Sequence, residues 1–252
     1  MITMSNFGSN GRLGNQLFQY AFMFSLSKQN NYEMCLPSTN SNFYKNYDLY
    51  FKSNSFFDCF ESNVSLCQKN ITQNKFKEKS FHYDINFPNY IDNCDYSGYY
   101  QSYKYFKEYK KELIESLKFK QKNIIKSELD YSKIVSIHIR RGDYVNNKTH
   151  ETFSFEFLNT SKKHFDNKKY LVFSDDIEWC KKMNIGDYYA ENNNDCLDLY
   201  QMTLCKSSII ANSSFSWWGA YLSEKEKVIA PKKWFNNNKN VDDLYCDGWI
   251  KL

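Results

Sequence analysis

The segment Val135-Ser-Ile-His-Ile-Arg-Arg-Gly-Asp-Tyr144 indicates how this chain of 252 residues is organised. Apolar and polar residues alternate up to Ile139, which predicts a strand that ends at two arginines, a glycine and an aspartate. Two guanidinium groups at the carboxyl end of a strand can bind a diphosphate, because each can donate to two oxygen atoms. Gly142 allows a turn, and Asp143 can orient an arginine or act on substrate. A surface ion pair is the alternative interpretation.

Further apolar runs of strand length follow this segment, and sequences with helical spacing separate them. Strands that alternate with helices predict βαβ units and a mostly parallel sheet, which binds ligands at the carboxyl ends of its strands. The predicted strands are 134–139, 170–173, 208–211 and 228–230, and the predicted helices are 153–166, 177–183, 196–206 and 214–225.

Two of these strands end in polar groups suited to a nucleotide. Ser208-Ile-Ile-Ala-Asn-Ser-Ser-Phe-Ser-Trp-Trp-Gly-Ala-Tyr-Leu222 predicts a strand and then a helix, whose first N–H groups favour an anion. Its polar residues are Asn212, Ser213, Ser214 and Ser216, and ordinary helix capping is the alternative. In Phe173-Ser-Asp-Asp176, Asp175 can accept hydrogen bonds from a ribose or a guanine, while capping of the next helix is again the alternative.

The N-terminal part begins with a predicted strand over 1–7, a loop with glycines at 8, 11 and 14, and a predicted helix over 13–28. The glycine spacing fits neither a dinucleotide-binding fingerprint nor a P-loop. Asn15 and Gln16 present a neutral polar pair beside the loop. A strand over 32–36 and an amphipathic helix over 102–117 are also predicted, whereas residues 38–93 give no assignable pattern.

Composition limits the classes of function. The formal net charge of +4 is spread along the chain, so no nucleic-acid partner is expected. No apolar run is long enough for a membrane span and no signal sequence precedes the first strand, so a cytoplasmic location is expected. The cysteines form no C-x-x-C pair, and those in apolar runs, such as Cys35 and Cys205, are expected to be buried free thiols.

Taken together, these segments resemble glycosyltransferase family 11, the α-1,2-fucosyltransferases, in the soluble bacterial form that has no membrane anchor. The matching pieces occur in the order found in the family. They are Gly11-Arg-Leu-Gly-Asn-Gln16 with Phe18-Gln-Tyr-Ala21, Gly98-Tyr-Tyr-Gln-Ser-Tyr-Lys-Tyr-Phe106, His138-Ile-Arg-Arg-Gly-Asp-Tyr144, Phe173-Ser-Asp-Asp176, Ala211-Asn-Ser-Ser-Phe-Ser-Trp-Trp-Gly219 and Ala230-Pro-Lys-Lys-Trp-Phe235.

The resemblance implies an α/β fold of GT-B type, with two Rossmann-like halves and a donor cleft between them. Residues 1–120 would form the acceptor-side half and residues 121–252 the half that binds the GDP-sugar. It further implies a donor, GDP-fucose, and an acceptor, a galactose-terminated glycan. No metal cofactor is expected, since metal-dependent glycosyltransferases typically present Asp-x-Asp and no two aspartates here have that spacing. Peripheral contact with a membrane that carries a lipid-linked acceptor is compatible with this picture.

The implied site follows from the same motifs. The donor-binding residues would be Arg140, Arg141, Asp175, Asn212, Ser213, Ser214, Ser216, Asn15 and Gln16. The implied reaction is an inverting single displacement, in which Arg140 and Arg141 stabilise the departing diphosphate. Asp143 is the first candidate for the general base, and His138 and Glu151 are fallbacks.

Several alternatives stay open at the level of the sequence. The donor could be another GDP-sugar, and the linkage could be α-1,6 or O-linked, because the His-x-Arg-Arg-Gly-Asp element also resembles that of those fucosyltransferases. A catalytically inert carbohydrate-binding protein would account for the aromatic content. The tripeptide Arg141-Gly-Asp143 also spells an adhesion motif, but it continues a buried-looking strand rather than an exposed loop tip.

Overall fold

The computed structural model describes residues 1–38, 55–68, 72–125, 127–145, 147, 153–191, 193–237 and 239–252. It divides into two compact units, Met1–Lys120 with Val241–Tyr245, and Gln121–Asn240 with Cys246–Leu252. The sequence analysis placed residues 241–245 in the second half, but this short segment packs with the first unit. There Asp243 forms an ion pair with Lys104 and accepts a hydrogen bond of 2.9 Å from the backbone N–H of Tyr83.

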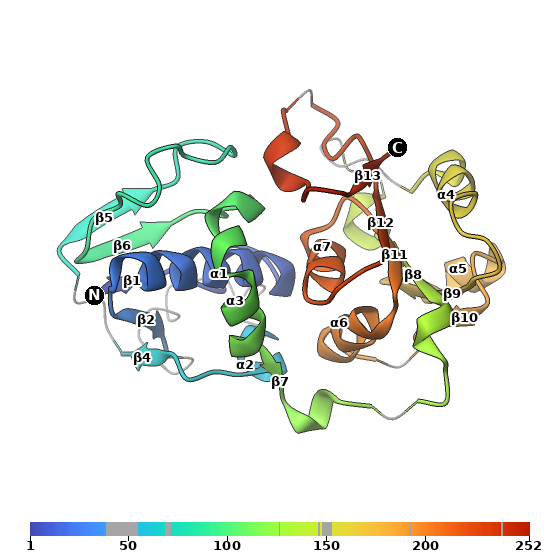
Figure 1. The fold of residues 1–252 in the computed structure, drawn as a ribbon, viewed down its shortest axis with the longest axis horizontal. Coiled ribbons are helices and arrows are strands. Elements are labelled where there is room, and N and C mark those ends of the chain that lie inside the picture. The colour runs from blue at the N-terminus through green and yellow to red at the C-terminus, as the bar shows by residue number, and fades with distance from the viewer. Residues whose placement is uncertain are drawn as a thin grey trace. The chain divides into compact units, whose positions relative to one another are not determined.

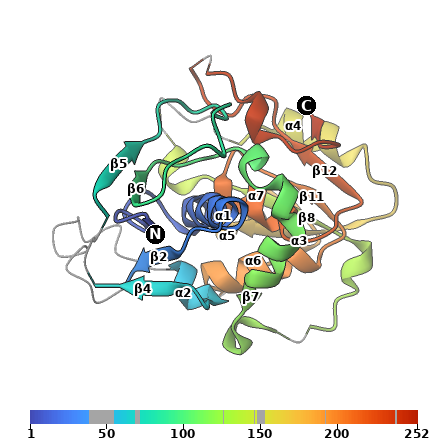
Figure 2. The same ribbon diagram turned by 60° about the vertical axis from the view of Figure 1, so that its left-hand side comes forward.

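The first unit has a parallel sheet with the strand order β4-β2-β1-β6-β5 in its described part. Helix α1 (Leu13–Asn30) contacts β1, β2 and α2, and most of its side chains are buried. Figure 2 shows α1 with β2 and α2 nearby. The C-cap of α1 is Asn31, whose left-handed backbone is typical of a helix end. The other elements are β1 (Ile2–Thr3), β2 (Met34–Pro37), α2 (Ser55–Cys59), β3 (Phe60–Glu61), β4 (Ser65–Cys67), β5 (Asn74–Lys77), β6 (Cys94–Ser97), α3 (Lys110–Ser116) and β7 (Lys118–Phe119).

The single helix predicted over 102–117 is wrong. The chain instead forms two short 3-10 helices, Tyr103–Tyr105 and Lys107–Tyr109, before α3. The hydroxyl of Ser102 caps the first of them, and the backbone of Phe106, with φ −136° and ψ 7°, departs from helical geometry. Tyr103, Tyr105 and Phe106 are buried in the core of this unit.

The second unit contains a parallel sheet with the strand order β10-β9-β8-β11-β12-β13 in its described part. Helices α4 and α5 lie on one side of the strands, and α6 and α7 lie on the other (Figure 1). The elements are β8 (Ile134–Ile139), α4 (Phe155–Lys162), β9 (Lys169–Ser174), α5 (Ile177–Lys182), β10 (Tyr188–Tyr189), α6 (Asp195–Leu204), β11 (Ser207–Ile209), α7 (Ser214–Tyr221), β12 (Lys227–Ala230) and β13 (Ile250–Lys251).

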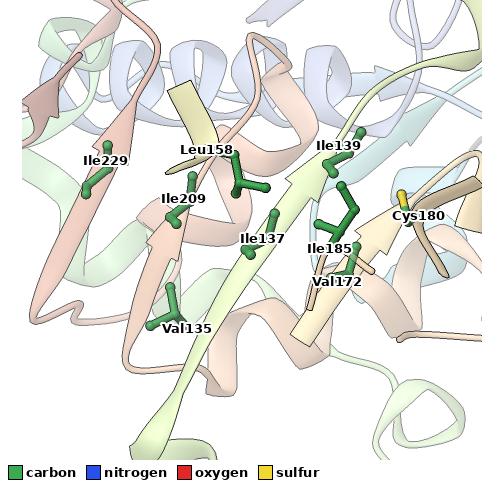
Figure 3. Packing of buried hydrophobic residues seen from close by; sticks show 9 residues of the cluster. All are labelled: Val135, Ile137, Ile139, Leu158, Val172, Cys180, Ile185, Ile209 and Ile229. Carbon is green, nitrogen blue, oxygen red and sulfur yellow. The ribbon is translucent and has the colours of Figure 1, made fainter. Parts of the chain in front are cut away.

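The alternation in β8 divides its side chains between the two faces of this sheet. Val135, Ile137 and Ile139 point into a core beneath α4 and α5, which Leu158 and Cys180 complete (Figure 3). On the other face Ile134 packs against residues of α6 and α7. Both faces of β8 are therefore buried, as expected for a central parallel strand, and its carboxyl end is held in a fixed position.

These findings confirm an α/β fold with parallel sheets. Cys35 and Cys205 are buried free thiols, as predicted. Among the helices in the described ranges, none combines the length and the apolar character that crossing a membrane requires.

Candidate functional site

The polar residues singled out in the sequence converge at one edge of the second unit's sheet. From β8 the chain proceeds through β9 to β10, and α6 then returns it to β11 on the opposite side of β8. The carboxyl ends of β8 and β11 therefore flank a topological switch point, where open α/β sheets bind their ligands. The loops after these two strands carry Arg140 to Tyr144 and Asn212 to Ser214.

Arg140 is fixed by two carboxylates. Its Nε and Nη2 donate to Oδ1 of Asp143 at 2.8 and 2.6 Å, and its Nη1 lies 3.0 Å from Oδ2 of Asp175. Only 17% of the arginine side chain is exposed, whereas Asp143 is 57% exposed. The guanidinium group is thus oriented before any ligand binds, which is the condition for strong electrostatic stabilisation.

Asp175 organises the turn that follows β8. Its Oδ1 accepts a hydrogen bond of 2.8 Å from the backbone N–H of Arg141, and its Oδ2 accepts one of 3.1 Å from the N–H of Gly142. A side chain at position 142 would place its Cβ 2.7 Å from that Oδ2, so glycine is needed here for close approach. Both oxygens of Asp175 are engaged in this structure, and a role with ribose or guanine stays a prediction.

The two arginines face different partners. Nε of Arg141 donates to Oδ2 of Asp176 at 3.2 Å, and its guanidinium carbon lies 3.8 Å from the centre of the Trp179 ring, a cation–π geometry. Asp176 is the N-cap of α5, as the alternative interpretation of this pair proposed. Arg141 is therefore anchored towards α5, while Arg140 is held between Asp143 and Asp175.

The loop after β11 is tied to both neighbouring loops. The side-chain amide of Asn212 donates to the main-chain carbonyl of Trp234 at 2.9 Å, and the main-chain carbonyl of Asn212 accepts from the hydroxyl of Tyr144 at 3.0 Å. Ser213 is the N-cap of α7, which begins at Ser214. The buried hydroxyl of Ser216 donates to main-chain carbonyls of this turn, so Ser216 supports the loop. The first amides of α7 lie in this supported turn.

His138 is buried just before Arg140 and is only 9% exposed. Burial, reinforced by the nearby charge of Arg140 and partly opposed by Asp175, lowers the pKa of the imidazole to about 3. His138 is therefore neutral near pH 7 and a poor acceptor of a proton from an acceptor hydroxyl. Within the described residues its Nδ1 is buried without a hydrogen-bond partner. These properties argue against the fallback role of general base.

A pocket of about 400 Å³ opens beside this cluster, within the range of small-molecule sites. His138, Arg140 and Asn212 line it, together with residues of α4 and of the loop after β12. Apolar side chains from β8, β11 and α4 form much of the remaining wall. An apolar pocket with a few convergent polar groups is suited to a nucleotide or another ligand with an anionic end.

Comparison with known proteins identifies the family. Residues 1–252 match the model of Glycosyl transferase family 11 over their whole length. This chain belongs to glycosyltransferase family 11. An alpha-1,2-colitosyltransferase of Escherichia coli is 33% identical over 96% of both chains. The O-antigen biosynthesis glycosyltransferase WbnK, also of Escherichia coli, is 26% identical over 96% of this chain and 98% of its own.

A more distant relative and a solved structure extend the comparison of this family 11 chain. A putative galactoside 2-alpha-L-fucosyltransferase, svh-11 of Caenorhabditis elegans, is 27% identical over 89% of this chain and 70% of its own. The crystal structure of the fucosyltransferase NodZ from Bradyrhizobium aligns with a TM-score of 0.53 at 12% identity and covers 88% of this chain and 93% of NodZ. This likeness shows a shared fold.

Two predicted site residues of the family 11 chain belong to the first unit. Gln16 is fully buried, its side-chain oxygen accepts from the backbone N–H of Phe56 at 2.9 Å, and its amide donates to the carbonyl of Gly11 at 3.4 Å. The side-chain oxygen of Asn15 accepts from Gln101 at 2.7 Å. Gln16 thus supports the glycine loop from within, and contact of either residue with the donor stays a prediction.

Sequence reasoning did not select two residues of α4, Glu156 and Thr160, that line the pocket. The signal was their place on the helix that directly follows the switch-point strand. Glu151, a fallback for the general base, lies outside the described residues. No group of three or more His, Cys, Asp or Glu side chains that could hold a metal occurs in the described ranges, and metal independence stays a prediction.

Proposed function

We propose that this family 11 chain transfers L-fucose from GDP-β-L-fucose to a hydroxyl of a galactose-terminated glycan in α-1,2 linkage, with inversion and without a metal ion. The observation that carries the proposal is the fixed guanidinium group of Arg140 beside the pocket at the switch point. The names of the relatives support the linkage, because those from two organisms specify position 2. NodZ, which shares the fold, is an alpha-1,6-fucosyltransferase whose crystals were soaked with GDP-fucose, so GDP-fucose is the first donor to test.

The proposal includes a GT-B arrangement, with the donor in a cleft between two Rossmann-like halves. Two compact units with a parallel sheet in each support this assignment. The GDP part would bind the second unit, at the carboxyl ends of β8 and β11, and the first unit would serve the acceptor. A cytoplasmic location, with peripheral contact to a membrane that carries a lipid-linked acceptor, completes the proposal.

The proposed reaction is a single displacement. The bond between C1 of the sugar and the β-phosphate oxygen breaks with oxocarbenium character, while an acceptor hydroxyl attacks the opposite face. Negative charge grows on the departing GDP. Arg140 and the first backbone amides of α7 would stabilise this charge, and the η nitrogens of Arg141 would contribute as well. The hydroxyl proton would pass to the carboxylate of Asp143, which is exposed and keeps a second oxygen beyond the one that binds Arg140.

A colitosyl group is the second candidate for the transferred sugar. The relative at 33% identity, which matches 96% of this chain, carries the name alpha-1,2-colitosyltransferase. Colitose is the 3-deoxy counterpart of fucose, so the diphosphate contacts would be the same for both donors. The two differ by one sugar hydroxyl, and a site that hydrogen-bonds this hydroxyl would reject colitose strongly.

The test measures GDP release in the presence of EDTA, with GDP-fucose, GDP-colitose and GDP-mannose as donors and a panel of galactosides as acceptors. Acceptor-dependent release with GDP-fucose and an α-1,2-linked product are expected. A preference for GDP-colitose would change the proposed sugar and leave the proposed site as it is. An α-1,6 or O-linked product would change the proposed linkage. Binding of GDP without turnover on any acceptor would favour a non-catalytic carbohydrate-binding protein.

A further inference from the structure

The pocket of the second unit extends beyond the residues proposed to bind the diphosphate. Arg140 and Asn212 belong to the loops after β8 and β11, whereas a further part of its wall comes from α4, where Glu156 and Thr160 line it. These two residues are four positions apart and therefore lie on the same face of the helix. Ile209 of β11 and the C-terminal Leu252 add apolar surface.

This distribution of polarity suggests how a nucleoside diphosphate would be oriented. A diphosphate requires cations and N–H donors, which the loops after β8 and β11 supply. A planar base is better accommodated by apolar walls with a small number of hydrogen-bonding groups at its edge. With the diphosphate at Arg140, the base is left with the part of the pocket that α4 lines.

Glu156 is available to bind the edge of such a base. It is the second residue of α4, and the helix start is already capped by Ser154, whose hydroxyl accepts from the backbone N–H of Phe157 at 3.2 Å. Glu156 is exposed and forms no hydrogen bond or ion pair with any residue in the described part of the chain. An ionised carboxylate only accepts hydrogen bonds, and its two oxygens match two neighbouring donors.

We propose that Glu156 determines the base specificity of this pocket by accepting hydrogen bonds from N1–H and the 2-amino group of guanine. This inference rests on the proposed function, because it assumes a GDP-linked donor. Guanine carries these two donors side by side on its Watson–Crick edge. Adenine presents an unprotonated N1 to the carboxylate instead, and hypoxanthine keeps N1–H but has no 2-amino group.

The test compares the binding of GDP and inosine diphosphate, which differ only in the 2-amino group, by calorimetry on the full chain. A hydrogen bond to a charged group is worth roughly 10- to 100-fold in affinity, so the parent chain is expected to prefer GDP by that factor. In Glu156→Gln the two affinities are expected to lie within about threefold of each other. Glu178→Gln is the matched control, because Glu178 is an exposed carboxylate on α5 that pairs with Lys181 outside the pocket.

The outcomes separate this inference from the proposed function. A Glu156→Gln protein that retains the parent's preference for GDP over inosine diphosphate overturns the inference and leaves the proposed function intact. The inference is also overturned if Glu156→Gln weakens the binding of GDP-fucose but not the binding of GDP, since Glu156 would then contact the sugar. A parent chain that binds another nucleoside diphosphate in place of GDP overturns the proposed function itself. Should Glu156→Gln fail to fold, Glu156→Asp, which withdraws the carboxylate by one methylene, is measured in the same way.

Discussion

Arg140 and Asp143 are joined through a single carboxylate oxygen, Oδ1, which accepts from Nε at 2.8 Å and from Nη2 at 2.6 Å. The same guanidinium group reaches Asp175 with its remaining nitrogen, Nη1, at 3.0 Å. All three nitrogens of Arg140 are thereby directed by carboxylates, and their position no longer depends on solvent. The roles of Arg140 and Asp143 can therefore be tested separately. When Asp143 is replaced, the carboxylate of Asp175 still holds Arg140.

Replacing Arg140 by alanine is expected to reduce turnover by about a hundred- to a thousandfold, or roughly 3–4 kcal/mol, because a preorganised donor to the leaving diphosphate is lost. Arg140→Lys should not restore it, since one ammonium group cannot reproduce the planar contacts to Asp143 and Asp175. The measurement is GDP release, with circular dichroism to verify the fold. Lys181→Ala, which removes a half-buried cation on α5 that pairs with Glu178 and Glu191, serves as the control. Near-normal turnover in folded Arg140→Ala would refute the donor-site assignment.

Asp143→Asn tests whether this carboxylate accepts the acceptor proton or only orients Arg140. For a general base, the rate of transfer should fall by about 10²–10⁴-fold, while the affinity for GDP changes little because the amide oxygen can still accept from Arg140. If Asp143 only orients Arg140, transfer and GDP affinity should both stay close to those of the parent, because the amide oxygen keeps that contact. Calorimetry with GDP and single-turnover transfer, measured on the same preparation, distinguish the two roles. We expect the first result, and near-parent transfer would contradict it.

The sequence was sufficient to locate the second unit's sheet and to predict which polar residues lie together at its edge. β8 was readable because its polar and apolar residues alternate, and β9, β11 and β12 because each is a compact apolar run between helical segments. Once these strands are parallel neighbours, the polar residues that follow β8 and β11 must meet at one edge of the sheet. The convergence of Arg140 with Asn212 and Ser213 therefore follows from strand order and polarity alone.

Other features could not be read from the sequence, because they depend on contacts between distant segments. Strand β10 has two residues and owes its existence to pairing with β9, not to a pattern of its own. Asp175 was interpreted as a ligand contact, yet its oxygens bind the main-chain amides of Arg141 and Gly142, and amide directions are set by the tertiary turn. Glu156 belongs to a helix face that becomes a pocket wall only when the sheet lies opposite.

Asp175→Asn is expected to lower the free energy of unfolding by about 1.5–3 kcal/mol, because a single amide oxygen cannot replace both oxygens that serve Arg141, Gly142 and Arg140. Urea denaturation measures this change. Asp176→Asn is the matched control and should cost less than about 1 kcal/mol, since asparagine is an equally good N-cap for α5 and the ion pair with Arg141 is partly exposed. An unchanged stability of Asp175→Asn, with weaker GDP binding, would instead support a direct contact with the nucleotide.

The buried imidazole of His138 should make the stability of the chain depend on pH. Its pKa falls to about 3 in the folded state, whereas an unfolded histidine titrates near 6.5. Below pH 6.5 the unfolded chain binds a proton that the folded chain excludes, so the contribution is complete above pH 6.5 and is lost as the pH falls towards 3. The expected slope of the free energy of unfolding is about 1.4 kcal/mol per pH unit.

The variant His138→Gln should remove this slope between pH 6.5 and 4.5. The control variant His164→Gln, at an exposed position, should keep it. Asp198, whose pKa burial raises to about 6, contributes with the opposite sign, and the comparison of variant with parent by urea denaturation at each pH cancels its effect. Equal slopes in the parent and in His138→Gln would show that His138 can be protonated in the folded chain, which would return it to consideration as the general base.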